Sequence, residues 1–362
     1  MLLIKRANIK NFKGLSEFEV NDLSRVTLIG GRNNIGKTTF LEALFLYFDR
    51  DNPQAIIRQY AWRNVMMVSI NPDALWAPIF SMYDTEKDIQ IRLWDEQNKL
   101  GKMDLKFNRN YRRWIPPDQT TLPGEPAQID TRANPSPNVC LDVIYQFEQN
   151  KPQTFHHIIG QQGISVDRAG TAPLPGFAYF VSATGRSSPQ DDAVHFGQLD
   201  ILGRQQEIVD FLRETVEPRL ESLSTVAVGQ QSLIHAKLKG YIRKIPVAYM
   251  GDGTARLLSN ILILATHPSQ PIFIDEIDIG IHYSALPKVW LGIVKAAKQY
   301  NCQVFATTHS YECLQAAVQG LPSELHEQFC YVRLEQNGPR TEGKTYSFDV
   351  LGAALEHGWE VR

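Results

Sequence analysis

Residues 30–39 have the sequence GGRNNIGKTT and follow a short apolar run, VTLI, at residues 26–29. Four of these residues match the pattern G-x-x-x-x-G-K-[ST]: Gly31, Gly36, Lys37 and Thr38. Glycines let backbone N–H groups turn toward phosphate oxygens at the start of a helix, where the helix dipole also favours negative charge. Apolar residues then recur at helical spacing over residues 40–48. The pattern therefore predicts a strand, a phosphate-binding loop and a helix in that order.

The composition is that of an ordinary folded protein with little net charge. Of the 362 residues, 43% are hydrophobic and 21% are charged, which suits two domains or one large domain with an insertion. The formal net charge of −2 gives no overall attraction to nucleic acid, so any such contact must use a local patch. No apolar run reaches the length of a membrane-spanning helix, and we expect no contact with a membrane.

The four cysteines are scattered through the chain and form no C-x-x-C pair. This spacing disfavours both a zinc site and a disulfide framework. The opening residues, MLLIKR, form a stretch too short for a secretory signal. We therefore expect the protein in a reducing, cytoplasmic environment.

Hydrophobic patterning predicts an α/β fold. From about residue 254 onward, helical and strand patterns alternate, which favours a parallel sheet covered by helices. For the whole chain we expect a P-loop fold with a mixed β-sheet covered by helices. We also expect a helix over residues 205–223 and a buried strand over residues 176–181. Residues 115–138 are rich in proline, threonine and asparagine and predict a loop. Short strand-like runs on both sides of this loop predict a β-rich inserted region.

A second feature is the sequence IFIDEID at residues 272–278. Three strand-forming residues lead directly into Asp275 and Glu276, and open α/β sheets bind ligands at the carboxyl ends of their strands. Asp275 would hold Mg²⁺ through water, and Glu276 would polarise an attacking water molecule. The alternative is a plain acidic cluster at the end of a strand, and the phosphate loop makes that the weaker interpretation.

Two further segments flank the acidic strand in the sequence. A strand pattern at residues 304–307 leads into a polar turn that contains His309. A lone histidine after a strand is more often structural, but this one follows the acidic strand by one helix, where a γ-phosphate sensor would lie. The segment MGDGTAR at residues 250–256 offers a glycine-rich helix N-terminus to an anion. A plain glycine turn, with Asp252 or Thr254 as the helix cap, is an equal alternative.

Together and in this order, the four segments resemble the ABC-type ATPases of the SMC, RecF and OLD branch. The four segments lie within GRNNIGKTTFLEAL, MGDGTARLL, FIDEIDIGIHYSALPKVW and QVFATTHSYECLQAA, and the opening stretch IKRANIKNFKG also resembles that group. The likeness is greatest to small stand-alone OLD-related (AAA-type, RecF-like) ATPases without a nuclease domain. It implies an ATPase domain formed by residues 1–50 and 175–362, with residues 51–174 as a β-rich inserted lobe that carries the proline-rich loop at 115–138.

The resemblance also implies a role for each motif. In such ATPases two subunits sandwich two ATP molecules, each held by the phosphate loop of one subunit and the signature turn of the other. Lys37, Glu276 and His309 would be the catalytic residues, and Thr38 and Asp275 would hold Mg²⁺. The residues implied in nucleotide binding are Gly31, Asn33, Asn34, Gly36, Lys37, Thr38, Thr39, Gly251, Asp252 and Gly253.

This sequence departs from the family pattern in two places. Asp252 stands where the signature turn has a serine or another small residue. Because phosphate would repel an acid, we expect the Asp252 side chain to point away and Arg256 to neutralise it. The glutamine loop of the family has no clear counterpart here. Only residues 310–362 follow His309, so we expect neither a nuclease domain nor the coiled-coil arms of SMC proteins.

The leading hypothesis is an ATP-hydrolysing homodimer or higher homo-oligomer that drives a separate effector protein or a nucleic-acid transaction. By analogy with the family, this activity would serve defence against phage or plasmids. The alternatives are a RecF-like DNA repair ATPase and an ATP-gated scaffold with negligible turnover. The Asp275–Glu276–His309 set argues against the static scaffold, since a protein that only binds ATP has no need of a base.

Two remaining patterns have both a functional and a structural interpretation. Cations that could contact nucleic acid alternate with aromatic residues over residues 106–114: Lys106, Arg109, Arg112 and Arg113. We favour the other interpretation, an alternating strand with a charged, solvated face. The adjacent His156 and His157 suggest a metal, but no other ligand lies at a matching spacing. We therefore expect a pair of strand histidines.

Overall fold

The computed structural model describes residues 3–65, 71–111, 138–160, 163–168, 178–183, 188–338 and 340–361. Thirteen of the strands share one large sheet: β1 Ile4–Phe12, β2 Leu15–Val20, β3 Val26–Gly31, β4 Ile89–Asp95, β5 Leu100–Tyr111, β6 Asn138–Phe147, β7 Gln153–Gly160, β8 Gly163–Arg168, β9 Tyr179–Val181, β13 Pro271–Ile274, β14 Gln303–Thr307, β15 Phe329–Asn337 and β16 Arg340–Ser347. A small second sheet contains β10 Leu220–Val228, β11 Gln231–Leu238 and β12 Ile245–Pro246. The α-helices are α1 Lys37–Phe48, α2 Ala55–Trp62, α3 Pro72–Leu75, α4 Pro189–Ile201, α5 Gln205–Thr215, α6 Asp252–Thr266, α7 Leu286–Gln299, α8 Tyr311–Gly320 and α9 Phe348–Glu356.

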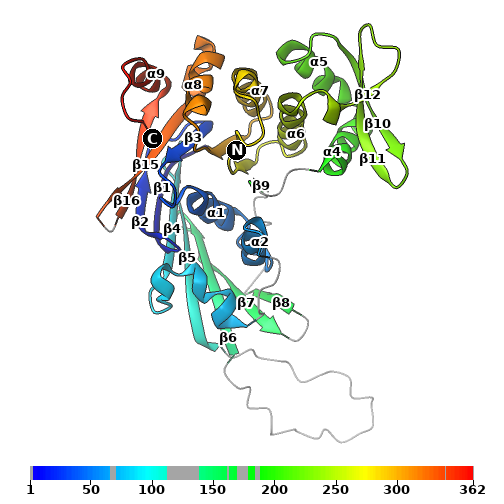
Figure 1. Ribbon diagram of the computed structural model, residues 1–362. Helices are drawn as coiled ribbons and strands as arrows, with labels where there is room; N and C mark the ends of the chain where they lie inside the picture. The colour runs from blue at the N-terminus through cyan, green and yellow to red at the C-terminus, as the bar shows by residue number, and fades with distance from the viewer. Residues whose placement is uncertain are drawn as a thin grey trace, which may run out of the picture.

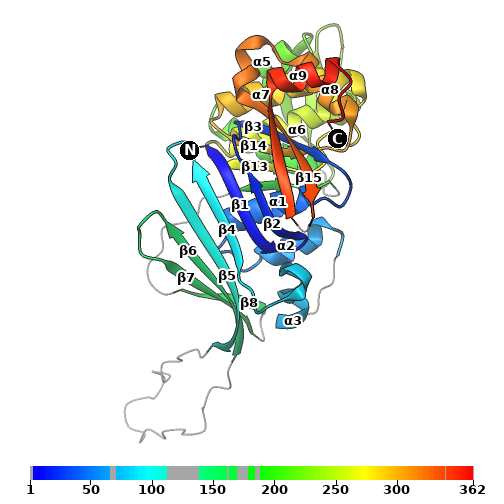
Figure 2. The ribbon, with the colours of Figure 1, turned by 90° about the vertical axis from the view of Figure 1, so that its left-hand side faces the viewer.

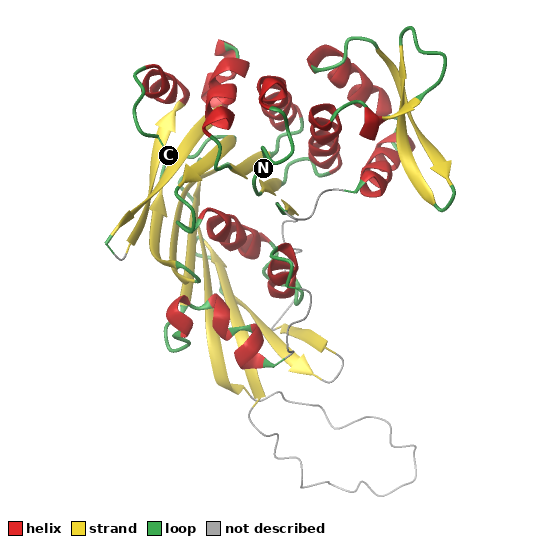
Figure 3. Cartoon of the chain, viewed as in Figure 1, coloured by secondary structure: helices red, strands yellow, loops and turns green. Residues whose placement is uncertain are grey.

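The large sheet is mixed. Its strand order is β8-β7-β6-β5-β4-β1-β2-β16-β15-β3-β14-β13-β9. From β8 to β2 neighbouring strands are antiparallel, whereas β15, β3, β14, β13 and β9 run parallel to one another. Helices cover both faces of the parallel part (Figures 1 and 3). The expected mixed sheet covered by helices is therefore confirmed.

Alternate residues of the central strands pack on opposite faces of the sheet. In β13, Phe273 belongs to the core shared with α1, whereas Ile272 and Ile274 belong to the core shared with α6 and α7. The next strand, β14, shows the same alternation, with Phe305 on the α1 side. Strands buried on both faces need apolar residues at every position, which explains the continuous runs IFI and VFA.

Helix α1 is buried on nearly every side, although the sequence pattern predicts a single apolar face. Lys37 and every residue from 39 to 47 are buried. The reason is that α1 lies between the parallel strands and the antiparallel strands β4 to β7, whose side chains share its core. Phe45 contacts Phe273 on one side, and Tyr47 contacts Tyr145 of β6 on the other. This burial fixes the helix that begins at the phosphate loop.

Strands β4 to β8 continue the sheet beyond β1 (Figure 2). Each of them pairs antiparallel with the next, and β4 pairs with β1. The described parts of residues 51–174 therefore share a sheet and a core with residues 3–50. The domain boundaries at residues 50 and 175 stay a prediction. Of the proline-rich stretch 115–138, the described residues include only Asn138, which begins β6.

Helices α4 and α5 and the small sheet form a unit beside α6 (Figure 1). The helix expected over residues 205–223 ends at Thr215, and Leu220 already begins β10. Pro218 explains the end, because proline has no N–H to donate and disfavours helical backbone before it. Helix α4 was not expected, although its Ser188–Asp191 capping box is a recognisable start signal.

The strand expected over residues 176–181 is β9 at the edge of the sheet. Its three residues are only half-buried, because β13 covers one side alone. Residues 176 and 177 lie outside the described residues. Among the helices described here, none combines the length and the apolar composition needed to cross a membrane.

Candidate active site

The phosphate loop connects the end of β3 to the start of α1. Three of its residues have positive φ angles: Gly31 at 130°, Asn34 at 61° and Gly36 at 106°. A Cβ atom at Gly31 would lie 2.7 Å from the carbonyl oxygen of Leu334, so only glycine fits this position. Among the described residues, no side chain caps the N-terminus of α1. Its first backbone N–H groups are therefore available to an anion.

Lys37, the first residue of α1, folds its side chain back over the loop. Its Nζ donates hydrogen bonds to the carbonyl oxygens of Gly31 at 2.8 Å and Arg32 at 2.9 Å. Burial lowers the pKa of Lys37 to about 8, while the charges of Asp275 and Glu276 act in the opposite direction. The ammonium group thus lies where it can exchange its carbonyl partners for phosphate oxygens.

Asp275 follows β13 and accepts hydrogen bonds from two threonine hydroxyls. Thr38 Oγ1 donates to Oδ1 and Oδ2 of Asp275 at 3.0 and 3.1 Å, and Thr307 Oγ1 donates to Oδ1 at 2.6 Å. Burial raises the pKa of Asp275, and the two hydroxyl bonds oppose that rise. A hydroxyl and a carboxylate in direct contact supply the hard oxygen ligands that Mg²⁺ prefers. Thr38 and Asp275 therefore fit a magnesium site.

Glu276 lies beside His309, with His309 Nε2 3.2 Å from Glu276 Oε1. The backbone of Glu276 has a φ of 51°, a left-handed conformation that is costly outside glycine and that concentrates at functional sites. Its N–H donates to Thr307 Oγ1 at 2.8 Å, which helps to hold this conformation. The side chains of Glu276 and His309 are 31% and 40% exposed, so water can reach both.

Thr308 ties the loop after β14 to the loop after β13. Its hydroxyl donates to Asp278 Oδ1 at 2.6 Å and accepts a hydrogen bond from the N–H of Ser310 at 3.0 Å. The loop after β13 then reaches the surface, where Ile279 and Tyr283 are exposed. The acidic strand and the histidine turn are thus held as one unit.

The glycine turn at residues 250–253 opens α6, which packs on the opposite face of the sheet from α1 (Figure 1). Gly251 has a φ of 99°, and a Cβ atom at Gly253 would lie 2.7 Å from Cβ of Ala285. Asp252 is exposed, and it lines a cavity of about 400 Å³ that Arg256 also lines. Within one chain, the turn and the phosphate loop therefore belong to different layers.

The motifs did not reveal a charged cluster around Glu42 of α1. Glu42 is fully buried and accepts hydrogen bonds from Lys13 Nζ and from Nε and Nη2 of Arg63, each at 2.8 Å. Lys13 Nζ also donates to Gln59 Oε1 at 2.6 Å. Burial lowers the pKa of Lys13, and Glu42 acts against that change. The sequence feature that could have predicted this cluster is the glutamate inside an apolar helix. A glutamate in such a place stays buried only when a cation pairs with it.

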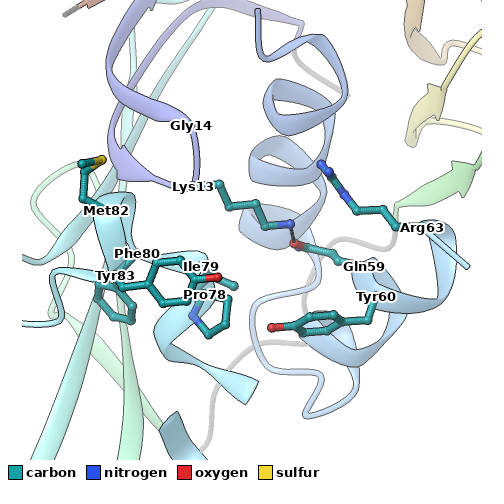
Figure 4. A pocket seen from close by; sticks show the side chains of 10 residues that line it. All are labelled: Lys13, Gly14, Gln59, Tyr60, Arg63, Pro78, Ile79, Phe80, Met82 and Tyr83. Carbon is teal, nitrogen blue, oxygen red and sulfur yellow. Dashed lines mark hydrogen bonds between the residues drawn. The ribbon is translucent and has the colours of Figure 1, made fainter. Parts of the chain in front are cut away.

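Lys13 and Arg63 also line a cavity of about 540 Å³ (Figure 4). The whole lining combines these cations with aromatic and apolar side chains: Lys13, Gly14, Gln59, Tyr60, Arg63, Pro78, Ile79, Phe80, Met82 and Tyr83. A Cβ atom at Gly36 would lie 2.7 Å from Cδ2 of Leu15, so the turn between β1 and β2 packs directly on the phosphate loop. Gly14 of the cavity lining is the chain neighbour of Leu15, which contacts the loop.

The chain leaves β9 beside the acidic strand. Val181 of β9 pairs with Ile274, and its carbonyl oxygen accepts a hydrogen bond from the Asp275 N–H at 2.8 Å. The next residue, Ser182, is buried. The chain after β9 thus leaves the same edge of the sheet as Asp275. Sequence patterns missed this, because β9 and β13 are neighbours only in the folded sheet.

The cationic stretch around β5 lies on the antiparallel part of the sheet. Residues 106–111 are part of β5, as expected, but burial alternates only over residues 100–105, and none of residues 106–111 is buried. Lys106 Nζ lies 3.0 Å from Asp88 Oδ2, and Arg109 Nη2 lies 3.5 Å from Asp73 Oδ1. Arg112 and Arg113 lie outside the described residues.

Comparison with known proteins supports an ATPase. Residues 3–164 match the family model described as an AAA ATPase domain. Residues 175–314 match the model described as an AAA domain, putative AbiEii toxin, Type IV TA system.

A curated relative and a solved structure span nearly the whole chain. An ATP/GTP phosphatase of Helicobacter pylori (strain ATCC 700392 / 26695) is 23% identical over 326 residues, covering 86% of this chain and 87% of the relative. The crystal structure of an SMC head bound to the C-winged helix domain of ScpA aligns with a TM-score of 0.50 at 12% identity, covering 96% of this chain and 99% of that one. At this identity the structural likeness speaks for the fold. It shows an SMC head-like P-loop fold, and the two family matches and the relative support ATP hydrolysis by this chain.

Proposed function

We propose that this ATPase works as a homodimer that closes around two ATP molecules and thereby controls a separate effector protein. The observation that carries the proposal is a continuous set of contacts between the two motifs. Thr38, Asp275, Thr307 and the Glu276 backbone form one chain of hydrogen bonds, with His309 on the Glu276 carboxylate. An oriented base beside a magnesium site suits hydrolysis rather than static binding of ATP.

In the proposed reaction, the α1 N–H groups and Lys37 bind the phosphates of ATP. Mg²⁺ held by Thr38 and Asp275 would neutralise phosphate charge. Glu276 accepts a proton from the water whose oxygen attacks the γ-phosphorus, and the bond to the bridging oxygen of ADP breaks. His309 orients Glu276 and lies on the side where the γ-phosphate would be sensed.

The position of the glycine turn supports the proposed dimer. The N-terminus of α6, like that of α1, has no side-chain cap among the described residues, so its amides are available to a second anion. Because α6 and α1 cover opposite faces of the sheet, we assign this anion to the partner's nucleotide. Three exposed apolar side chains near the turn and the acidic strand would be covered in such a dimer: Tyr249, Ile279 and Tyr283.

We also propose a binding place for the nucleobase and a role for the effector. The cavity beside the phosphate loop combines aromatic faces with Lys13 and Arg63, a combination suited to a nucleoside. The relative's name includes both ATP and GTP, so competition between the two nucleotides is the direct test of the base. The second family description names a toxin system, which supports a role with a partner protein in defence. Contact with nucleic acid through Lys106, Arg109, Arg112 and Arg113 stays a prediction.

Light scattering on the Glu276→Gln variant tests the dimer, because this variant should bind ATP without hydrolysing it. We expect its mass to double with ATP and Mg²⁺ and to stay monomeric with ADP. The Lys37→Ala, Glu276→Gln double variant is the control and should stay monomeric throughout. A monomer with bound ATP, or a dimer that ignores nucleotide, would contradict ATP-gated assembly.

A further inference from the structure

A second cluster of ligand-type side chains lies at the other end of the large sheet. Cys140 and Asp142 lie on β6 and His156 lies on β7, with one ligand atom of each within 4.8 Å of the other two. Asp142 and His156 are direct partners across the two strands, and Cys140 is two residues from Asp142. Residues two apart in a strand share a face, so all three side chains meet on one side of the sheet. The hairpin thus joins ligands that the sequence spacing did not connect.

One carboxylate oxygen is the centre of this cluster. Cys140 Sγ lies 3.0 Å from Asp142 Oδ1, and His156 Nδ1 lies 2.6 Å from the same oxygen. The second oxygen, Oδ2, accepts a hydrogen bond from Asn108 Nδ2 at 2.9 Å, which fixes the carboxylate plane. Such outer hydrogen bonds orient ligands in established metal sites. The thiol and imidazole protons therefore point into one small volume.

The three side chains of this cluster are buried to different degrees. Cys140 is fully buried, Asp142 is almost so, and the His156 side chain is 22% exposed. The Tyr111 ring lies against the His156 ring, with centroids 4.6 Å apart, and the Tyr111 hydroxyl donates to Asp167 Oδ2 at 2.7 Å. Three protein ligands leave a fourth tetrahedral position, which a water molecule takes in catalytic zinc sites.

We propose that Cys140, Asp142 and His156 form a binding site for Zn²⁺ or a metal of similar preference. A thiolate, an imidazole and a carboxylate suit zinc, whereas Mg²⁺ and Ca²⁺ take oxygen ligands. Tetrahedral binding places ligand atoms roughly 3.3–3.6 Å apart, so the contacts of Cys140 Sγ and His156 Nδ1 with Asp142 Oδ1, now 3.0 Å and 2.6 Å, would lengthen on binding. On binding, the Cys140 thiol releases one proton to solvent, and neutral His156 binds through Nδ1 with its proton on Nε2.

This site is separate from the ATPase centre. Strands β6 and β7 stand eight and nine positions from β14 in the sheet order, with β4, β1 and β2 among the strands between them. The metal would cross-link β6 and β7, the two strands of this hairpin. We therefore expect its binding to leave the chemistry of ATP hydrolysis unchanged and to stabilise this end of the sheet.

Titration of the chelator-treated full chain with Co²⁺ tests the proposal, because a thiolate ligand gives Co²⁺ a charge-transfer band. We expect one equivalent to produce the band, Zn²⁺ to displace it, and Cys140→Ser to abolish it. His156→Ala should weaken Co²⁺ binding at least about tenfold. Cys313→Ala removes a buried cysteine elsewhere and should keep the band.

The competing outcomes are distinct. No band in the parent chain, or a band that persists in Cys140→Ser, would overturn the site. His156 is partly exposed, so its variant keeps the test available if substitutions at Cys140 prevent folding. In that case unchanged Co²⁺ affinity in His156→Ala would count against the proposal.

Discussion

His309 Nε2 lies 3.2 Å from Glu276 Oε1, while the N–H of Glu276 donates to Thr307 at 2.8 Å. The side chain and the backbone of Glu276 are therefore fixed by two residues, Thr307 at the end of β14 and His309 on the loop after it. A carboxylate fixed in this way can accept a proton from water without first losing conformational freedom.

Replacement of Glu276 by glutamine should slow ATP hydrolysis by about 100-fold or more, because a general base contributes at least that much. ATP binding should change little, since Lys37 and the α1 amides remain. Steady-state phosphate release and nucleotide titration measure the two effects. Glu324→Gln, on an exposed surface, is the matched control and should hydrolyse ATP at the parental rate. Parental turnover in Glu276→Gln would show that another group is the base.

Nucleotide binding should weaken at alkaline pH because of Lys37. Its pKa of about 8 means that the free protein carries a neutral Lys37 above that pH, whereas phosphate binding needs the charged form. Affinity should therefore be about tenfold lower at pH 9 than at pH 7, with proton uptake on binding. Calorimetry in buffers of different ionisation enthalpy measures that uptake. Lys37→Arg stays charged and should lose the pH dependence, whereas tighter binding at pH 9 would contradict the assignment.

Removal of the Glu42 charge should cost about 3 kcal/mol of unfolding free energy, because it leaves Lys13 and Arg63 without their buried partner. Urea unfolding of Glu42→Gln measures this loss. The control is Glu335→Gln, whose pairs with Arg333 and Lys344 are partly exposed. We expect less than about 1 kcal/mol there. Equal losses in the two variants would mean that burial does not distinguish the two clusters.

His157 should make the protein sensitive to mild acid. It lies buried on β7 beside the carbonyl oxygen of Arg50, with Nε2 3.1 Å away, and burial lowers its pKa from 6.5 to about 4. Between these values the unfolded chain binds a proton that the folded chain does not, so stability falls as pH falls. The loss should reach about 2 kcal/mol at pH 5 and about 3 kcal/mol below pH 4.

Unfolding at pH 7.5 and pH 5 measures the His157 effect. Glutamine at this position can still donate to Arg50 but does not titrate in this range. His157→Gln should therefore lose about 2 kcal/mol less than the parent between the two pH values. An identical loss in both proteins would assign the acid sensitivity to other groups.

Local sequence predicted the parts of the site whose chemistry is contiguous in the chain. Glycines, Lys37 and Thr38 occur together because one turn must hold them, and Asp275 follows directly from a run of strand residues. The end of the helix at Thr215 could also have been predicted, because Pro218 disfavours further helix. The amphipathic spacing nevertheless led to a predicted helix that extends to residue 223. Helix α4 was similarly signalled by its cap at Ser188.

The remainder depends on which strands become neighbours. Ser182 lies next to Asp275 only because β9 pairs with β13, and Glu42 has partners from the β1–β2 turn and from α2. Cys140 and His156 meet only through the β6–β7 register. These contacts join residues that are far apart in the sequence, so no local sequence pattern could have predicted them.

The position of β3 between β14 and β15 has a consequence for synthesis of the protein. The strand that ends in the phosphate loop emerges early from the ribosome, but both of its neighbours lie beyond residue 300. Until β14 and β15 are translated, the backbone groups of β3 have no strand to pair with. The apolar residues of β3 therefore stay exposed in the nascent chain. A truncated polypeptide that keeps the whole GGRNNIGKTT sequence should therefore be unable to take up nucleotide, and competence arises only when translation is nearly complete.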